Sequence, residues 1–314
     1  MEFGFDIPSG GPMATPENIA MLARKGEELG FDIISVSDHI VIPKRIESRY
    51  PYGETGEWPP GADECLEMLT TLSFVAGQTS RARLLTSVMV LPHRNPVPTA
   101  KMLATVDVLS KGRLIVGCGV GWMREEFEVI GAPPYEERGA VGDEYLQAFK
   151  ELWTSENPSF EGKYCRFSNL SFLPRPVQKP HPPIWIGGES PPALRRTARL
   201  GNGWFPIGNN PRHTVETTVQ LGEYLSRLRG YAQEAGRDPS EIDVAYAMPA
   251  YSLGQAQLLS NGDRRPFTGT AQQIADDAKA FEEMGVRHLM LGYSLEEGIP
   301  EQLERFADQV RPLL

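Results

Sequence analysis

The sequence predicts an α/β protein with the architecture of a (β/α)8 TIM barrel. One pattern repeats from end to end: an amphipathic helix, a glycine and a short apolar strand. About eight such strands occur, each followed by a helical pattern, and this alternation places parallel strands inside a ring of helices. The 314 residues also accommodate the roughly 250 residues of such a barrel together with insertions. A doubly wound open sheet is the alternative that the same alternation allows.

The first repeat shows how the elements follow from the sequence. Pro16 is suited to a first helical turn, and Ile19 and Leu22 lie on one face of the helix that follows. Gly30 is suited to ending this helix in the left-handed conformation, and residues 31–37 then have the apolar pattern of a strand. The eight strands expected in this way are residues 3–7, 31–37, 83–91, 113–118, 184–187, 203–207, 243–250 and 288–291.

Two segments are too long to be ordinary connections. Residues 42–63 follow the second strand and are rich in proline, glycine and tyrosine, which is typical of a long loop that builds or covers a site. Residues 156–183 are rich in proline and contain an expected hairpin over 159–172, before the fifth strand. Neither composition nor charge marks a boundary, so we expect residues 1–314 to form a single domain with these two insertions.

The composition excludes several classes of partner. There are 31 Lys and Arg against 41 Asp and Glu, a net charge of −10, whereas nucleic acid or an anionic membrane attracts clustered cations. No apolar run approaches the ~20 residues of a membrane span. The first residues lack the basic and apolar regions of a secretory signal. The sequence therefore predicts a cytoplasmic protein with no nucleic-acid or membrane partner.

Metal and hydrolase chemistry find no support in the motifs. The three cysteines, Cys65, Cys118 and Cys165, form no CxxC pair, and the five histidines form no HxH or HExxH pattern. The acidic run at residues 125–128 has no histidine at ligand spacing, so we expect it to be a solvated helix start. No GxSxG motif occurs. We expect no metal site.

In a barrel of this kind the active site lies at the carboxyl ends of the strands. Asp38 and His39 directly follow the second strand. Histidine is a candidate general acid or base because its ordinary pKa lies near neutrality. The alternative is that His39 only hydrogen-bonds to a nearby backbone carbonyl.

Glycines follow the fourth and fifth strands. Gly117 and Gly119 allow close backbone approach to a planar or anionic ligand, although a tight barrel corner would also explain them. Gly187 and Gly188 precede a helix that begins at Pro191, and free N–H groups at a helix start favour a phosphate. Arg195 and Arg196, one turn into that helix, are candidates to add positive charge.

Together, several segments resemble a known family. They are Asp38-His39, TSVMVLPHRNPV at 86–97, AKMLATVDVLSKGRLIVGCGVGW at 100–122 and IGGES at 186–190. Over residues 3–206 the chain resembles the bacterial luciferase-like superfamily, and more closely its branch of coenzyme F420-dependent oxidoreductases. The resemblance implies a barrel that holds a flavin or deazaflavin across its mouth, and a homodimer.

The resemblance also implies roles for individual residues. Asp38 and His39 match a pair that contacts the ring edge or the reacting substrate and are the expected catalytic residues. Ser87 and Val88 match a bulge behind the ring, with a cis peptide bond between them. The positions matched to cofactor binding are Asp38, Ser87, Val88, Val90, Gly117, Gly119, Gly187 and Gly188.

The implied function is hydride transfer between F420 and an unidentified small organic substrate. The alternative is an FMN-dependent monooxygenase. Val120 argues against this alternative, because flavin enzymes of this type have a phosphate-binding arginine at the matching position. A non-catalytic flavin-binding barrel is a third hypothesis, disfavoured because Asp38 and His39 are both present. Lys44, Arg45 and Arg49 are candidates for binding the oligoglutamate tail of F420.

Overall fold

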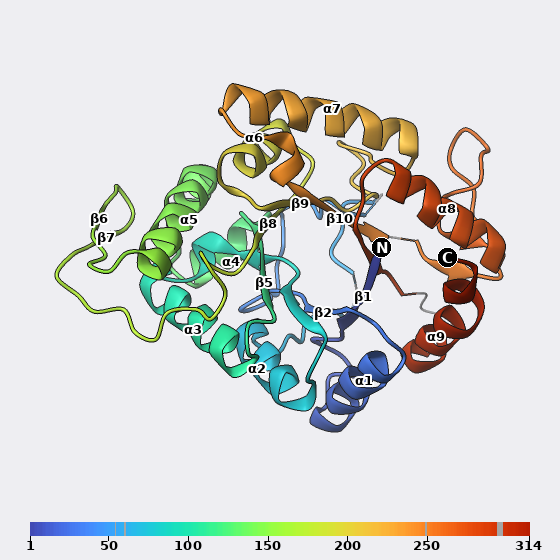
Figure 1. The fold of residues 1–314 in the computed structure, drawn as a ribbon, viewed down its shortest axis with the longest axis horizontal. Coiled ribbons are helices and arrows are strands. Elements are labelled where there is room, and N and C mark those ends of the chain that lie inside the picture. The colour runs from blue at the N-terminus through green and yellow to red at the C-terminus, as the bar shows by residue number, and fades with distance from the viewer. Residues whose placement is uncertain (54, 60, 249, 294–297) are drawn as a thin grey trace.

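Eight parallel strands close into a barrel in the computed structural model (Figure 1), which describes residues 1–53, 55–59, 61–248, 250–293 and 298–314. Neighbours around the barrel pair in the order β3-β2-β1-β13-β10-β9-β8-β5, and pairing of β3 with β5 closes it. The predicted (β/α)8 architecture is confirmed. The barrel strands are β1 (Glu2–Ile7), β2 (Ile33–Val36), β3 (Arg83–Thr86), β5 (Leu114–Gly119), β8 (Ile184–Gly187), β9 (Gly203–Phe205), β10 (Asp243–Met248) and β13 (His288–Leu291).

Helices form the outer ring, as Figure 1 shows. The first begins at Pro16 after Thr15, whose Oγ1 accepts a hydrogen bond of 3.2 Å from the Asn18 N–H. Gly30, just beyond its end, has φ +82, as its expected role as a helix terminator requires. The helices are α1 (Pro16–Glu28), α2 (Met68–Gln78), α3 (Pro96–Leu109), α4 (Arg124–Val129), α5 (Arg138–Thr154), α6 (Pro191–Leu200), α7 (Thr218–Glu234), α8 (Ala271–Glu283) and α9 (Ile299–Arg305).

Short elements complete the chain. The expected hairpin is present as an antiparallel pair between α5 and β8. Between β2 and α2 no described residue belongs to a helix or strand, and positions 54 and 60 of this loop lie outside the described residues. The short strands are β4 (Met89–Val90), β6 (Phe160–Glu161), β7 (Arg166–Phe167), β11 (Ser252–Leu253) and β12 (Thr268–Gly269). Single helical turns are Leu91–His93, Tyr135–Glu137, Pro239–Glu241, Phe306–Val310 and Arg311–Leu313.

Several predicted strands differ from the observed ones. The strand expected over 31–37 spans only Ile33–Val36. The strand expected over 83–91 divides into β3 and β4, because a cis peptide bond joins Ser87 to Val88. The strand expected over 203–207 is continuous only to Phe205; Ile207 forms an isolated parallel bridge with Ala247, and its N–H donates to the Glu189 side chain. The strand expected over 243–250 ends at Met248, and position 249 lies outside the described residues.

The barrel interior is apolar and closed below its mouth. One layer of side chains from successive strands is buried: Ile33, Leu85, Ile115, Trp185, Phe205, Ala245 and Met290. A much larger apolar layer separates the strands from the helices. No described helix has the length and apolar character needed to cross a membrane. The interior is therefore a packed core, and a ligand has access only at the ends of the strands.

Candidate active site

Small, half-buried residues lie directly above this buried layer at the carboxyl ends of the strands. Because side chains alternate along a strand, the position two residues beyond each inward-facing residue also faces the barrel axis. These positions carry glycine or alanine at Gly187, Ala247 and Gly292, and all three are half-buried. Around β8, β10 and β13 the mouth therefore has a floor of small residues, whereas Asp6 and Ile207 occupy the corresponding positions of β1 and β9.

Val88 completes this floor. A Cβ placed at Gly119 would lie 2.8 Å from Val88 Cγ2, and one at Gly187 would lie 3.1 Å from Val88 Cγ1. A Cβ at Gly117 would lie 2.0 Å from the Thr86 carbonyl oxygen. These three glycines thus make room for the bulge after β3, so tight packing of the barrel explains them. Their contact with a cofactor stays a prediction.

Asp38 is buried at the end of β2 with both carboxylate oxygens occupied. Arg94 donates from Nη1 to Oδ2 and from Nη2 to Oδ1, each at 2.7 Å, and the Val90 N–H donates to Oδ2 at 2.8 Å. Arg94 also reaches Glu67 at 2.9 Å. Asp38 thereby joins the second strand to the bulge and to α2, and Val90 enters the site through its backbone.

His39 points to a different carboxylate. Its Nδ1 lies 2.7 Å from Glu126 Oε2, while Glu126 Oε1 accepts from the N–H groups of Ile40 and Val41 at 2.6 and 3.3 Å. The Glu126 side chain is fully buried. The expectation that residues 125–128 form only a solvated helix start is therefore wrong for Glu126. Its signal in the sequence is its place beside Phe127, at the buried face of an amphipathic turn.

Charge decides which atom of this pair carries the proton. Burial opposes ionisation of Glu126, but the hydrogen bond with His39 and the nearby imidazoles hold the pKa of its carboxyl below the ordinary value. An ionised carboxylate only accepts hydrogen bonds, so Nδ1 of His39 is the donor. In the neutral imidazole Nε2 is then unprotonated, and it has no hydrogen-bond partner among the described residues. His39 can therefore exchange a proton through Nε2.

His93 is the third member of this group. Its Nδ1 lies 3.7 Å from Glu126 Oε1, beyond hydrogen-bond distance, and both ring nitrogens are buried without a partner in the described part of the chain. Burial lowers the pKa of His93 to about 4. This imidazole is neutral near neutral pH, and it does not compete with His39 for the carboxylate.

Four aromatic residues form a cluster beside His39. We call Tyr50, Tyr52, Trp58 and Trp122 the aromatic cluster. Trp58 and Trp122 stack with ring centroids 5.5 Å apart, and Tyr50 meets each of them edge-on at 5.3 Å. The His39 ring lies 5.0 Å from that of Trp58. The loop after β2 thus borders the candidate acid–base group, as the sequence led us to expect of residues 42–63.

The corner after β8 offers fewer donors than the sequence suggested. Gly188 has φ +100, which a side chain would strain. The first two residues of α6 are prolines without N–H groups, and the next two N–H groups donate to Ser190, to Oγ at 3.4 Å and to the carbonyl at 3.0 Å. Helix α6 therefore presents no free N–H in its first turn. Phosphate binding at Gly187 and Gly188 stays a prediction.

Glu189, which the sequence did not single out, is buried at the same corner. Its carboxylate accepts from the Ile207 N–H at 2.7 Å and from Asn210 Nδ2 at 3.1 Å. Burial raises the pKa of Glu189 to about 7. Asn209 Nδ2 also donates to the Tyr52 carbonyl at 3.1 Å. This corner thus joins the loop after β9 to the aromatic cluster.

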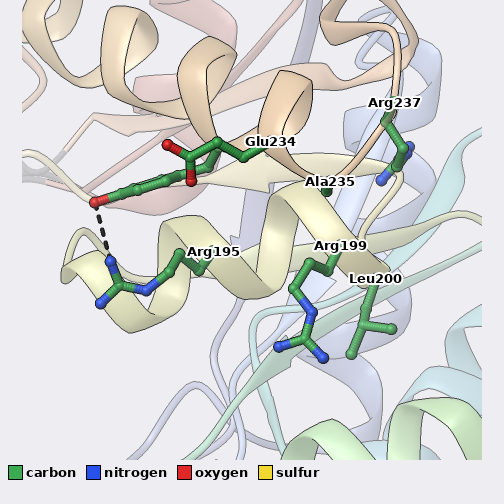
Figure 2. Close-up of a pocket in the computed structure, with 7 residues that line it drawn as sticks. Arg195, Arg199, Leu200, Glu234, Ala235 and Arg237 are labelled. Atoms are coloured by element: carbon green, nitrogen blue, oxygen red, sulfur yellow. Dashed lines mark hydrogen bonds between the residues drawn. The ribbon is translucent and has the colours of Figure 1, made fainter.

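The two arginines expected to support a phosphate point elsewhere. Arg196 pairs with Asp143 and donates to the Gly139 carbonyl at 2.9 Å. Arg195 donates to the Tyr231 hydroxyl at 3.1 Å, in a pocket of about 550 Å³ between α6 and α7 on the outside of the barrel (Figure 2). Arg237, which lines the same pocket, donates to the Gly201 carbonyl at 2.7 Å and so caps the end of α6.

Arg138 supplies a cation close to the loop after β5. Its Nε lies 3.3 Å from the Gly121 carbonyl, one residue beyond Val120, and its guanidinium lies 4.0 Å above the Tyr135 ring. The Val120 side chain packs instead against α5, where a Cβ at Gly142 would lie 2.9 Å from it. The positive charge that Val120 lacks is therefore present on a neighbouring helix.

The cations proposed for an oligoglutamate tail lie in the loop after β2. Arg45 is exposed and pairs with Glu47 at 2.5 Å, while Arg49 donates to the Thr55 carbonyl at 2.9 Å. Lys44 is also exposed. Within the described ranges no three His, Cys, Asp or Glu side chains gather closely enough to hold a metal ion.

The structure thus combines a closed barrel with a buried carboxylate–histidine pair at its mouth. The family model of luciferase-like monooxygenases matches residues 1–257, and the chain belongs to this family. The protein is therefore an oxidoreductase of the luciferase-like type.

Proteins named for FMNH2 and for F420 are both similar to this chain, the first in sequence and the second in fold. The uncharacterized protein Rv0953c of Mycobacterium tuberculosis is 31% identical over 268 residues, which cover 84% of this chain and 91% of that protein. An FMNH2-dependent dimethylsulfone monooxygenase of Pseudomonas putida is 27% identical over 296 residues, covering 81% and 80%. The F420-dependent tetrahydromethanopterin reductase of Methanopyrus kandleri shares the fold, with a TM-score of 0.76 at 18% identity over 99% of this chain and 98% of that chain.

Proposed function

We propose that the protein is an F420-dependent oxidoreductase that transfers a hydride between the deazaflavin and a small organic substrate. The observation that carries this proposal is the hydrogen bond from His39 Nδ1 to the buried Glu126 carboxylate. It leaves Nε2 as the proton-exchanging atom at the mouth. Oxidation of an alcohol to a carbonyl compound releases one hydride and one proton, so a ring that takes the hydride needs such a base beside it.

The residues of the mouth fit a planar cofactor with an anionic side chain. The floor formed by Val88 and the small residues around it accommodates a flat ring. When bound, F420 supplies a carbon centre, C5, that accepts or donates a hydride. For its phosphate the chain offers Arg138, beside the loop after β5, and the backbone at Gly188. Asp38 lies beneath this floor, where its carboxylate accepts from the Val90 N–H and so holds the bulge that carries Val88.

The aromatic cluster favours a substrate that is apolar or aromatic. Its rings border His39 and offer aromatic edges and faces, which bind apolar groups well. His39 Nε2, the candidate proton-exchanging atom, supplies the polar contact to such a substrate. A substrate with one hydroxyl or carbonyl group on an apolar body matches this arrangement.

FMN is the second candidate cofactor. The dimethylsulfone monooxygenase relative uses FMNH2. Arg138 also supplies the cation that Val120 cannot, which removes the main argument from sequence against an FMN phosphate. In that alternative the protein is a luciferase-like monooxygenase, and the loop after β2 serves to exclude water.

Titration of the purified apoprotein with F420 and with FMN, oxidised and reduced, tests the choice. Trp58 and Trp122 lie beside His39, so their fluorescence reports binding at the mouth, and a W58F variant serves to assign the signal. We expect micromolar or tighter binding of F420, at least tenfold tighter than that of FMN, a difference of about 1.4 kcal/mol. Equal or tighter binding of FMN would overturn the proposal.

We further propose that the protein forms a homodimer through α2 and α3. These helices pack side by side (Figure 1) and expose Phe74, Met102 and Leu109. Exposed apolar residues on adjacent helices are typical of an interface. Light scattering coupled to size-exclusion chromatography should give twice the chain mass, and a Phe74→Glu, Leu109→Glu variant should give a monomer. A monomeric wild-type protein would contradict this.

A further inference from the structure

We infer that Glu126 is a positioning residue that fixes the protonation site of His39, so that Nδ1 carries the proton and Nε2 faces the reaction. This inference rests on the proposed function for its catalytic consequence. Its structural content, the tautomer of His39, is independent of any cofactor. A residue of this kind acts through the histidine and does not touch the substrate.

The hydrogen bonds around Glu126 leave no freedom in its orientation. Oε2 accepts from His39 Nδ1 at 2.7 Å, and Oε1 accepts from the backbone N–H groups of Ile40 and Val41. Three donors thus converge on one carboxylate. An amide in its place would turn an NH2 group toward one of these donors, since it has only one acceptor oxygen. The site is therefore built for a carboxylate.

Burial makes this carboxylate effective. The Glu126 side chain has no exposed surface, and that of His39 is 17% exposed. A charge-assisted hydrogen bond in such surroundings is stronger than one in water. His39 is thus held by a strong bond on one nitrogen and is open on the other, the arrangement that a directional proton transfer requires.

Each charged or titratable group packed around the pair is compatible with this role. From the turn after β4, His93 is neutral, because burial lowers its pKa to about 4. Arg94, on the same segment, is paired with Asp38 at the end of β2. Cys65, from the loop before α2, has a pKa raised by burial and by the neighbouring carboxylates, so it remains a thiol. None of these three groups can replace the Glu126 carboxylate as the partner of His39 Nδ1.

Glu125 provides a matched control on the same helix. Its carboxylate accepts from the N–H groups of Glu47 and Ser48 at 2.7 and 2.9 Å, so it too anchors the loop after β2. No hydrogen bond joins it to His39 in the described part of the chain. Glu125→Gln therefore reproduces the loss of a loop-anchoring carboxylate without altering the imidazole.

The first test is the tautomer of His39 in the wild-type apoprotein, measured by nitrogen-15 NMR of the histidine side chains. At about pH 8.5, some two units above the ordinary imidazole pKa, neutral rings dominate. We expect the His39 signals, assigned with a His39→Gln variant, to show a proton on Nδ1 and none on Nε2. A proton on Nε2 would overturn the inference, whether or not any variant folds.

The second test compares Glu126→Gln with Glu125→Gln. We expect Glu126→Gln to abolish the preference for Nδ1–H and to lower kcat about 10- to 100-fold with little change in KM, as when other groups that orient a histidine are removed. Glu126→Asp, which keeps the charge, should retain part of the rate. Equal effects of Glu126→Gln and Glu125→Gln on the tautomer and on kcat would reduce Glu126 to a loop anchor. Failure of F420 to bind would contradict the proposed function and leave the tautomer result standing.

Discussion

Asp38 and Arg94 form a two-point ion pair beneath the mouth of the barrel, with both N–O distances at 2.7 Å. The Asp38 side chain is fully buried, and that of Arg94 is 9% exposed. The pair joins the end of β2 to the turn after β4, the two segments that carry His39 and His93. The aspartate of the Asp-His motif is thus a structural partner of an arginine, while the histidine turns to Glu126.

Replacing Asp38 by asparagine should therefore destabilise the fold. The variant keeps the shape and an acceptor for the Val90 N–H, but it leaves the buried Arg94 without its main anionic partner. Breaking a buried ion pair on one side typically costs about 3–5 kcal/mol of unfolding free energy. Urea denaturation monitored by circular dichroism measures this loss. Glu67→Gln, which alters a partner that is 39% exposed, should cost less than about 1 kcal/mol.

His39→Ala should abolish most of the activity, and it should also lower the free energy of unfolding, because the buried Glu126 carboxylate loses one of its three donors. General acid–base groups typically supply about 100- to 10,000-fold in rate, so turnover of a true substrate should fall by that factor. Cofactor affinity should change little, because the ring would rest on backbone and small side chains. Steady-state kinetics and the fluorescence titration measure the two effects separately. A variant with wild-type turnover would show that His39 only hydrogen-bonds to Glu126.

The alternation of helices and strands was enough to predict the barrel, because the apolar residues of each helix or strand recur with the period of that element. The bulge after β3 has no such local signal: residues 84–91 are apolar apart from Thr86 and Ser87, so the pattern alone predicts one continuous strand. The resemblance to a family supplied the cis peptide bond between Ser87 and Val88 that the structure contains. Local pattern thus predicted the elements, and the resemblance to a family predicted the exception.

The candidate site was only partly predictable, since its polar contacts join distant segments. Glu126 lies 87 residues after His39, and no pattern within either segment indicates that they meet. The same holds for Glu189, whose partners Ile207 and Asn210 come from the loop after the next strand. A motif identifies which residues follow a strand, whereas the pairing of their side chains depends on how the strands close.

The packing of Val88 against the glycines gives a prediction about paired substitutions. Gly119→Ala places a methyl group 2.8 Å from Val88 Cγ2, and overpacking of this kind typically costs about 1–3 kcal/mol. Val88→Ala removes that contact, so the double variant should be more stable than the sum of the single effects predicts. Urea denaturation of the three variants measures the coupling. Gly77→Ala is the control, because a Cβ there meets nothing within 4 Å; it should stabilise α2 slightly. Strict additivity of the Val88 and Gly119 effects would contradict the contact.

Glu189 should make the protein less stable as the pH rises from about 4.5 to about 7. Burial raises its pKa in the folded state to about 7, from an ordinary value of 4.5. Below pH 4.5 the folded and unfolded chains are both protonated at this group, so it contributes nothing. Between these two values the unfolded chain releases the proton while the folded chain retains it, and the free energy of unfolding falls. The loss is complete above pH 7 and amounts to about 3 kcal/mol.

A Glu189→Gln variant isolates this contribution. Glutamine does not titrate, so its altered hydrogen bonds to Ile207 and Asn210 shift the stability by an amount that is independent of pH. Asp6, buried with a pKa raised to about 6, has an effect of the same sign, but it is common to both proteins and cancels in the comparison. Urea denaturation at several pH values from about 5 to about 8 should show the wild-type protein losing up to about 3 kcal/mol more than the variant. Parallel curves for the two proteins would mean that Glu189 is already ionised in the folded state, with Asn210 and the Ile207 N–H solvating its charge.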